Sequence, residues 1–261
     1  MPSSAPDTGF REERVGGALL LSLDRTAAGN ALDEATIAAL RARLEAAASD
    51  LTLRCVILAG TGRFFCAGGD LKAYRALVTR EELERVFGAA RLLLDAIEAS
   101  PLPVIAAIDG YALGGGAELA LACDLRVAGA GAIIGFPQLR LGIIPGWDGL
   151  ERLAALVGRG TTMRLLLTGE RLSAEAALRE GLVDIAAADA RGAALDIAAA
   201  LEGAAPLAIR GMKEALRAMG RPRAEARLVA ANVFARLWFT EDHREAETAF
   251  AEKREAAFHG R

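Results

Sequence analysis

Short apolar runs alternate with longer amphipathic segments along the first half of the chain. Apolar runs of strand length occur at residues 19–23, 53–59 and 103–108. Residues 33–48 instead carry apolar side chains at the three- and four-residue spacing of a helix, with Asp33 as a candidate N-cap. A second helical pattern, at residues 81–99, lies between the last two runs. This order predicts a sheet whose strands are joined by helices.

The second half of the chain is predicted to be mostly helical. Two short strands are expected at residues 125–128 and 132–136. Beyond Gly149, apolar spacing predicts helices at residues 188–202, 207–219, 224–239 and 241–258. No linker rich in Pro, Gly or Ser separates these parts, so we expect one domain with a helical C-terminal extension.

Composition narrows the functional class. The 261 residues are 53% hydrophobic and 25% charged, as in globular proteins, and the net charge of −3 argues against a nucleic-acid partner. No apolar run has the length of a membrane span, and residues 1–6 lack the features of a signal peptide. Cys55, Cys66 and Cys123 lie in core-like segments without CxxC spacing, which indicates reduced thiols and a cytoplasmic protein.

A run of three glycines precedes Glu118, the most informative residue of the chain. Gly114, Gly115 and Gly116 stand within an otherwise apolar segment. Glycines that open a helix present N–H donors and the positive end of the helix dipole to an anion. A carboxylate one turn further on enters apolar surroundings, where its pKa rises toward the range of a general acid/base. The alternative is a solvated glutamate near a glycine-rich helix start.

A second glycine cluster follows a buried strand. Residues 56–59 lead into a segment that contains Gly60, Gly62, Gly68 and Gly69 and ends at Asp70. Because ligands of open α/β sheets bind where strands end, this segment predicts the second half of a binding site. A dinucleotide-binding turn is a weaker alternative, since the GxG at residues 60–62 lacks the third glycine of that motif.

The two glycine segments resemble those of a known family. Residues 64–71 (FFCAGGDL) and 110–119 (GYALGGGAEL) are similar to the two signature segments of the crotonase (enoyl-CoA hydratase/isomerase) superfamily. The resemblance continues at residues 123–126, 141–146, 167–174, 205–208 and 240–254, and covers the chain from about residue 19 to residue 258. Several collinear motifs are more specific than one glycine loop.

This resemblance implies a fold and an assembly. The implied fold class is α/β, a crotonase-like spiral of ββα units with a helical C-terminal trimerisation region. Residues 1–14 would be a flexible lead-in, residues 15–200 the spiral core and residues 201–261 the oligomerisation region. A homotrimer or hexamer is expected, in which Lys253 and Phe258 reach the coenzyme A site of a neighbouring subunit.

The resemblance also implies a reaction centre. The family's substrates are coenzyme A thioesters of the kind used in fatty-acid metabolism, and two backbone amides hold the enolate oxygen that forms from them. Carried over residue by residue, these amides map to Ala67 and Gly115, with Glu118 transferring protons. Removing one such donor typically costs about 3 to 4 kcal/mol of barrier. No metal or redox cofactor is expected, and the only histidines, His243 and His259, lie in the terminal tail.

Further substrate contacts are implied in the same way. The adenine end of coenzyme A is expected along residues 67–71, which include Gly69, Asp70 and Leu71. Arg25, on the loop after the first strand, is a candidate phosphate contact and can equally be a solvated surface group. Trp147 is expected either to line the acyl pocket or to pack in the core.

One position departs from the family pattern. Hydratases of the family hold a water molecule between two glutamates, the second of which stands seven residues before the Pro-Gly element. Here that position is Gln138, before Pro145, and an amide cannot act as a base at neutral pH. Asp148 and Glu151 are candidate replacements, although Asp148 is at least as well placed to cap the helix that begins near Gly149.

The sequence therefore predicts an acyl-CoA enzyme with enoyl-CoA hydratase-like chemistry. A double-bond isomerase or an acyl-CoA decarboxylase that uses the same oxyanion hole is the alternative among enzymes. Because the second glutamate is missing, a catalytically poor acyl-CoA-binding subunit is the alternative outside them. Turnover of crotonyl-CoA, as against binding without turnover, separates these classes.

Overall fold

The computed structural model describes residues 8–261, and its larger sheet has six strands. Their order is β1-β2-β3-β5-β7-β10, and only the β1–β2 pair is antiparallel. The strands are β1 (Phe10–Val15), β2 (Ala18–Leu23), β3 (Cys55–Gly60), β5 (Val104–Ile108), β7 (Leu125–Gly129) and β10 (Ile185–Ala187). The strands predicted from the three long apolar runs are confirmed as β2, β3 and β5.

The strands of a second, smaller sheet alternate along the chain with those of the larger one. Its order is β4-β6-β8-β9, formed by β4 (Phe64–Cys66), β6 (Tyr111–Leu113), β8 (Ile133–Gly135) and β9 (Arg171–Ser173). Along the chain β3 leads into β4, β5 into β6 and β7 into β8, so each turn of the chain adds one strand to each sheet. This repetition is the spiral that the family resemblance implied, and it confirms the α/β fold class.

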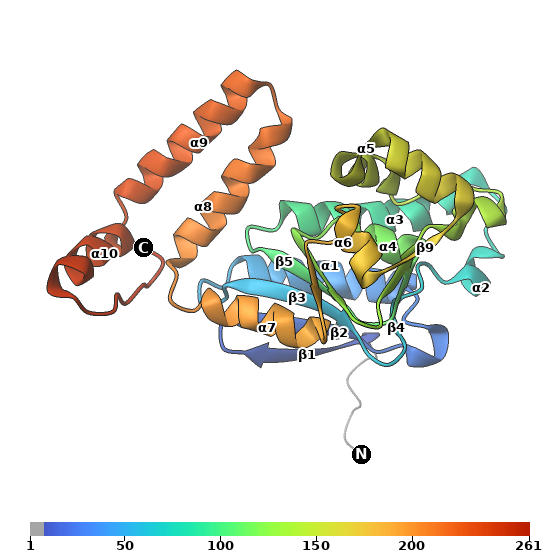
Figure 1. Ribbon diagram of the computed structural model, residues 1–261, viewed down its shortest axis with the longest axis horizontal. Coiled ribbons are helices and arrows are strands. Elements are labelled where there is room, and N and C mark those ends of the chain that lie inside the picture. The colour runs from blue at the N-terminus through green and yellow to red at the C-terminus, as the bar shows by residue number, and fades with distance from the viewer. Residues whose placement is uncertain (1–7) are drawn as a thin grey trace, which may run out of the picture.

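Helices cover both faces of the larger sheet (Figure 1). α1 (Glu34–Ala48) and α3 (Arg80–Ala99) pack on one face with Leu19 and Leu21 of β2, whereas α7 (Ala190–Ala200) packs on the other with Leu20. Successive side chains of a strand point to opposite faces, so both faces of the sheet must be apolar. The strands therefore read as continuous apolar runs and not as alternating ones.

Shorter elements complete the body of the molecule. They are α2 (Leu71–Tyr74), α4 (Gly115–Leu121), α5 (Gly149–Thr168), α6 (Ala174–Arg179) and the 3-10 turns η1 (Thr26–Ala28) and η2 (Pro137–Leu141). The predicted cap of α1 is confirmed, because the Asp33 carboxylate accepts a hydrogen bond from the Thr36 N–H at 2.8 Å. None of the helices in residues 8–261 combines the length and the hydropathy that crossing a membrane requires.

Three C-terminal helices stand to one side of the sheets. Figure 1 shows α8 (Pro206–Arg217), α9 (Arg223–Trp238) and α10 (Glu241–Glu252) apart from the body, with the turn η3 (Ala218–Gly220) between the first two. Lys213 anchors α8 to the body: its ammonium group donates to the carbonyls of Ile97 and Leu102, both at 3.0 Å, and to Asp124 at 2.5 Å.

Two predicted boundaries differ from the structure. Residues 10–14 are not a flexible lead-in but part of β1, which pairs with β2 along its whole length; residues 1–7 lie outside the described part. The last helix ends at Glu252 and not near residue 258, because Lys253 takes a left-handed conformation (φ 57°). The chain then folds back along α10, as described below.

Candidate active site

Two turns of the chain meet where neighbouring strands of the smaller sheet end. β4 leads through residues 67–70 into α2, and β6 leads through Gly114 into α4. Because β4 and β6 pair in parallel, their carboxyl ends lie side by side. The turns approach so closely that a Cβ on Gly68 would lie 3.0 Å from the Gly115 nitrogen. With a φ of +107° as well, Gly68 is a position that only glycine fills without strain.

The amides of Gly115 and Ala67 differ in what they bind. Gly115 is the first residue of α4, so its N–H has no partner within the helix and is free to face a ligand. The Ala67 N–H instead donates to the Gly29 carbonyl at 3.0 Å. The prediction that Ala67 supplies an oxyanion-hole amide is therefore wrong, since that donor is already used inside the fold.

The N–H of Gly69, two residues further on, is not used in this way. A parallel bridge joins Gly69 to Leu32, and it uses the Gly68 carbonyl and the Asp70 N–H. The N–H of Gly69 itself takes no part in this bridge. Sequence reasoning placed Gly69 only among the coenzyme A contacts, because the motif does not reveal which amides of a turn the neighbouring segment occupies.

Glu118 lies inside the site with its carboxylate buried. Its side chain, 2% exposed, comes from the first turn of α4. Oε2 accepts hydrogen bonds from the backbone N–H groups of Trp147 at 2.8 Å and Gly149 at 2.9 Å. The positive φ of Asp148 (61°) turns both amides toward one oxygen, as in the concave amide nests that bind anions. The prediction of a buried Glu118, not a solvated one, is confirmed.

Two opposing effects set the proton affinity of Glu118. Burial raises the pKa of its carboxyl group above the usual value, while the N–H groups of Trp147 and Gly149 and the Gln138 amide lower it by less. Burial disfavours the charged form because the interior solvates an ion poorly. The result is a carboxylate that is held in place and still accepts a proton more readily than an exposed glutamate does.

Gln138 stands next to Glu118, as the family pattern requires of the second position. It lies in η2, is 6% exposed, and donates from Nε2 to Oε1 of Glu118 at 3.0 Å. Its own Oε1 is buried without a hydrogen-bond partner among residues 8–261. A buried acceptor of this kind is uncommon in a folded protein and marks a position where a ligand or water can bind.

The two candidate replacements for the missing glutamate lie elsewhere. Asp148 is exposed, and it makes no side-chain cap to α5, so the predicted cap is wrong. Together with Glu151 and Asp95 it lines a separate cavity of about 430 Å³. Among residues 8–261, those that line this cavity do not include Glu118. The contribution of Asp148 to the site is its backbone turn, which aims the neighbouring amides at Glu118.

Two aromatic side chains cover the glycines of the site, and a third packs against one of them. The buried ring of Trp147 lies where a Cβ on Gly115 would come within 2.7 Å of it, and so lines the site beside the α4 turn. Tyr74 of α2 lies in the same way over Gly69. Its ring contacts that of Phe87, with 4.9 Å between centroids. Sequence reasoning missed Tyr74, although its place four residues after Asp70 was a usable signal.

Two of the predicted coenzyme A contacts, Arg25 and Asp70, interact with each other and with neighbouring residues. Arg25 is paired with Asp33 at 2.7 Å and lies 3.6 Å from Asp70. The other oxygen of Asp70 accepts from the N–H groups of Lys72 and Ala73 and caps α2. Arg25 is thus an ion-paired group and not a freely solvated one. Leu71 is 56% exposed at the start of α2.

Lys253 and Phe258 follow α10 in the C-terminal region, which Figure 1 shows apart from the body that contains α4. Lys253 is exposed, and the half-buried Phe258 lines an apolar cavity of about 310 Å³ with residues of α8, α9 and α10. Within one chain, therefore, neither residue contributes to the Glu118 site.

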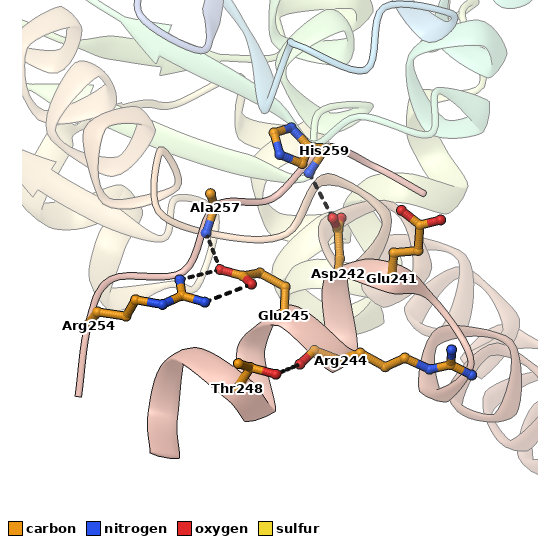
Figure 2. Close-up of a pocket in the computed structure, with 8 residues that line it drawn as sticks. All are labelled: Glu241, Asp242, Arg244, Glu245, Thr248, Arg254, Ala257 and His259. Atoms are coloured by element: carbon orange, nitrogen blue, oxygen red, sulfur yellow. Dashed lines mark hydrogen bonds and ion pairs between the residues drawn. The ribbon is translucent and has the colours of Figure 1, made fainter. Parts of the chain in front are cut away.

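The C-terminal tail, residues 253–261, is hydrogen-bonded to α10. Figure 2 shows Glu245 between the guanidinium of Arg254 and the N–H of Ala257, and Asp242 accepting from the N–H of His259. Bonds to Arg254 and Ala257 hold the pKa of Glu245 low, at about 2. In this pocket of about 420 Å³ Glu245 is paired with Arg254, and Asp242 accepts from the backbone N–H groups of His259 and Gly260, so these acidic groups already have partners.

Residues 13–261 match the family model described as enoyl-CoA hydratase/isomerase. The chain belongs to this family. It is 40% identical over 255 residues to the 2,3-dehydroadipyl-CoA hydratase of Escherichia coli (strain K12), a match that covers 96% of this chain and 97% of that protein. It is 37% identical over 258 residues to the enoyl-CoA isomerase/hydratase fer4 of Mycosarcoma maydis, covering 94% and 93%.

Solved structures agree with the family assignment. The crystal structure of an enoyl-CoA hydratase from Bacillus anthracis matches with a TM-score of 0.92 and 34% identity, over 97% of this chain and all of that one (100%). As a member of the enoyl-CoA hydratase/isomerase family, the protein is an acyl-CoA thioester enzyme. The prediction of the superfamily is confirmed.

Proposed function

We propose that the enzyme hydrates a 2-enoyl-CoA thioester, with Glu118 as the acid/base. The observation that carries the proposal is a buried carboxylate with a raised pKa, held by two amides, beside the paired turns that contain Gly69 and Gly115. In this proposal the N–H groups of Gly69 and Gly115 bind the thioester oxygen. They stabilise the negative charge that develops there when the substrate becomes an enolate.

A single carboxylate is sufficient for the proton transfers of hydration. Glu118 takes a proton from water as the water oxygen bonds to the β-carbon, and electrons of the double bond move toward the thioester oxygen. The resulting enolate then receives that proton at the α-carbon, which regenerates the carboxylate. One molecule of water is added in total, and no metal or redox group takes part in these steps.

Gln138 has a positioning role in this mechanism. Its Nε2 donates a hydrogen bond to Glu118. This bond fixes the orientation of the amide and leaves Oε1 without a partner among residues 8–261. An amide oxygen accepts a hydrogen bond but does not remove a proton at neutral pH. Gln138 therefore orients the attacking water, which donates to its Oε1, while Glu118 performs the base chemistry alone.

Double-bond isomerisation is the second candidate, and the same residue favours it. With Gln138 in place of a second carboxylate, Glu118 is the acid/base group of the site. An isomerase that moves a proton from the α-carbon to the γ-carbon of a 3-enoyl thioester needs one such group and an oxyanion hole. It needs no oriented water, so a poor hydratase with this geometry can still be an efficient isomerase.

We also propose a homotrimer or hexamer. Large apolar side chains remain exposed on α8 to α10, including Met212, Leu216, Phe234, Phe239 and Phe250 at 62–87% exposure. Apolar surface of this extent on neighbouring helices is typical of protein interfaces. In such an assembly Lys253 or Phe258 would reach a neighbouring subunit's site. Sedimentation that shows only monomer at micromolar concentration contradicts this.

A substrate panel tests the reaction. Purified protein is assayed with crotonyl-CoA, a 3-enoyl-CoA, and malonyl-CoA, with product identity determined by mass spectrometry. Hydration of crotonyl-CoA at rates typical of enzymes supports the first proposal, and shift of the double bond without hydration supports the second. Loss of carbon dioxide from malonyl-CoA would favour a decarboxylase. Binding of all three without turnover contradicts an enzymatic role for the Glu118 site.

A further inference from the structure

Tyr74 places a hydroxyl group against one of the two turns of the site. It ends the short helix α2, and its ring is half-buried against Phe87. A Cβ on Gly69 would lie 2.0 Å from the Tyr74 oxygen, so the hydroxyl lies directly over the Gly69 backbone. This is the residue whose N–H is free of the bridge to Leu32.

The Tyr74 hydroxyl is buried and has no hydrogen-bond partner in the described part of the chain. The acceptors near it are occupied: Asp70 caps α2 and faces Arg25, and both oxygens of Glu118 receive N–H donors. The adjacent Trp147 side chain carries a donor and no acceptor. An unsatisfied buried hydroxyl is costly for the fold, so it indicates a bond formed with a ligand.

We propose that Tyr74 is a further catalytic residue, whose hydroxyl donates a third hydrogen bond to the thioester oxygen beside the N–H groups of Gly69 and Gly115. This inference rests on the proposed function, because it needs an enolate at that oxygen. The rings of Tyr74 and Trp147 also lie against Gly69 and Gly115, and hydrogen bonds to a developing charge are stronger where such apolar groups replace water.

Tyr74 carries a neutral hydroxyl group near pH 7. Burial raises the pKa of the phenol to about 12, opposed in part by the indole N–H of Trp147 and supported by smaller contributions from Cys66, Asp70 and Glu118. The negative charges of Asp70 and Glu118 also make a phenolate unfavourable. The group is therefore a neutral donor and not a base, which suits oxyanion stabilisation and leaves proton transfer to Glu118.

Tyr74→Phe is the direct test, and the chain offers a matched control. Tyr111 is the other of its two tyrosines, and its hydroxyl lies near Arg63, at 3.5 Å, and away from the glycine turns. We expect Tyr74→Phe to lower kcat for the preferred enoyl-CoA by about 100-fold with little change in KM, as for the loss of one oxyanion donor. Tyr111→Phe should leave kcat within about twofold. Thermal unfolding confirms that both variants fold.

Acetoacetyl-CoA provides a second measurement that needs no turnover. Its enolate absorbs in the near ultraviolet, so a titration reports how much of the bound ligand is ionised. Wild type and Tyr111→Phe should stabilise the enolate, and Tyr74→Phe should hold a smaller enolate fraction at the same pH. An unchanged fraction in Tyr74→Phe, or equal losses of kcat in both variants, overturns the assignment. A Tyr74-dependent enolate in a protein that turns over no enoyl-CoA would reject the proposed function and support this inference.

Discussion

Glu118 and Lys213 are both nearly inaccessible, at 2% and 5% exposure, but their surroundings differ. The three N–H donors of Lys213 meet three acceptors, two carbonyls and Asp124. Around Glu118, polar atoms are left over: the Gln138 oxygen and the Tyr74 hydroxyl have no partner among the described residues. The Lys213 cluster is complete by itself, whereas the Glu118 cluster is complete only with a ligand.

The two clusters also respond differently to burial. Burial lowers the pKa of Lys213, but Asp124 opposes the effect, and the pair joins α8 to the body. Burial raises the pKa of Glu118, and its partners among residues 8–261 are backbone N–H groups and the Gln138 amide, with no cation paired to it. A buried charge that is paired with an opposite charge indicates a structural role. A buried charge that has only neutral partners, with polar atoms beside it left unbonded, indicates a catalytic role.

The largest effect is expected from Glu118→Gln. The variant loses the acid/base group, which is typically worth about 100- to 10,000-fold, so steady-state turnover should fall by that factor. The new amide oxygen still accepts from the Trp147 and Gly149 N–H groups, and the new NH2 group donates to the Gln138 oxygen once the Gln138 amide flips. Glu151→Gln, on the exposed surface of α5, is the control and should keep wild-type activity. Full activity in Glu118→Gln would move the chemistry to another residue.

The difference in stability between Glu118→Gln and wild type should depend on pH. A raised pKa in the folded state means that Glu118 favours folding while protonated, and that this contribution is lost as the pH rises from the unfolded value of about 4.5 through the folded one. Glu118→Gln should therefore be more stable than wild type at pH 7, by a margin that shrinks toward pH 4. Urea unfolding at several pH values measures this, and an unchanged margin contradicts the raised pKa.

Lys213→Ala should weaken the fold without weakening the chemistry of the site. Removing one partner of a buried pair typically costs about 3–5 kcal/mol, because Asp124 and two carbonyls lose their donor. Urea unfolding gives the free energy, with Arg217→Ala on the same helix as an exposed control. Below the temperature of unfolding, kcat per folded molecule should stay near that of wild type. A stability loss under about 1 kcal/mol would mean that α8 is held elsewhere.

Gly115→Ala tests the packing between the α4 turn and Trp147. The added methyl group would lie within 2.7–2.9 Å of the indole ring, so the ring must move. We expect a destabilisation of about 1–3 kcal/mol, as for overpacked cores, and a fall in kcat of at least tenfold. Gly131→Ala, where a Cβ meets nothing within 4 Å, is the matched control. Equal effects of the two substitutions contradict a close fit at Gly115.

Gln138→Glu is expected to give the smallest change. It supplies the second carboxylate of the family pattern, but 3.0 Å from an oxygen of Glu118, so the two groups must share a proton. We expect crotonyl-CoA hydration to rise by about tenfold, below the full range of acid/base catalysis, with a shifted pH optimum. Wild-type hydration already equal to that of the variant would mean that Gln138 orients water well enough.

The predictability of the site varied with what each residue depends on. Glu118 was predicted as a buried acid/base because a glycine run, an apolar segment and a family motif coincide in one stretch of chain. Ala67 was assigned wrongly because its amide is taken by Gly29, which is 38 residues away and belongs to another loop. Asp148 was expected to cap a helix with its side chain, but its left-handed backbone conformation points that side chain elsewhere.

The sequence by itself determined the elements whose causes are local. Apolar runs specify strands that are buried on both faces, helical spacing specifies α1 and α3, and Asp33 caps α1 through its own side chain. Tertiary structure alone decided which polar groups meet. Glu118, Gln138 and Trp147 come from three segments up to 29 residues apart, and Tyr74 reaches Gly69 through the path of α2. Hydrogen-bond partners and burial depend on the packed surroundings of a group, and these exist only once the two sheets have assembled.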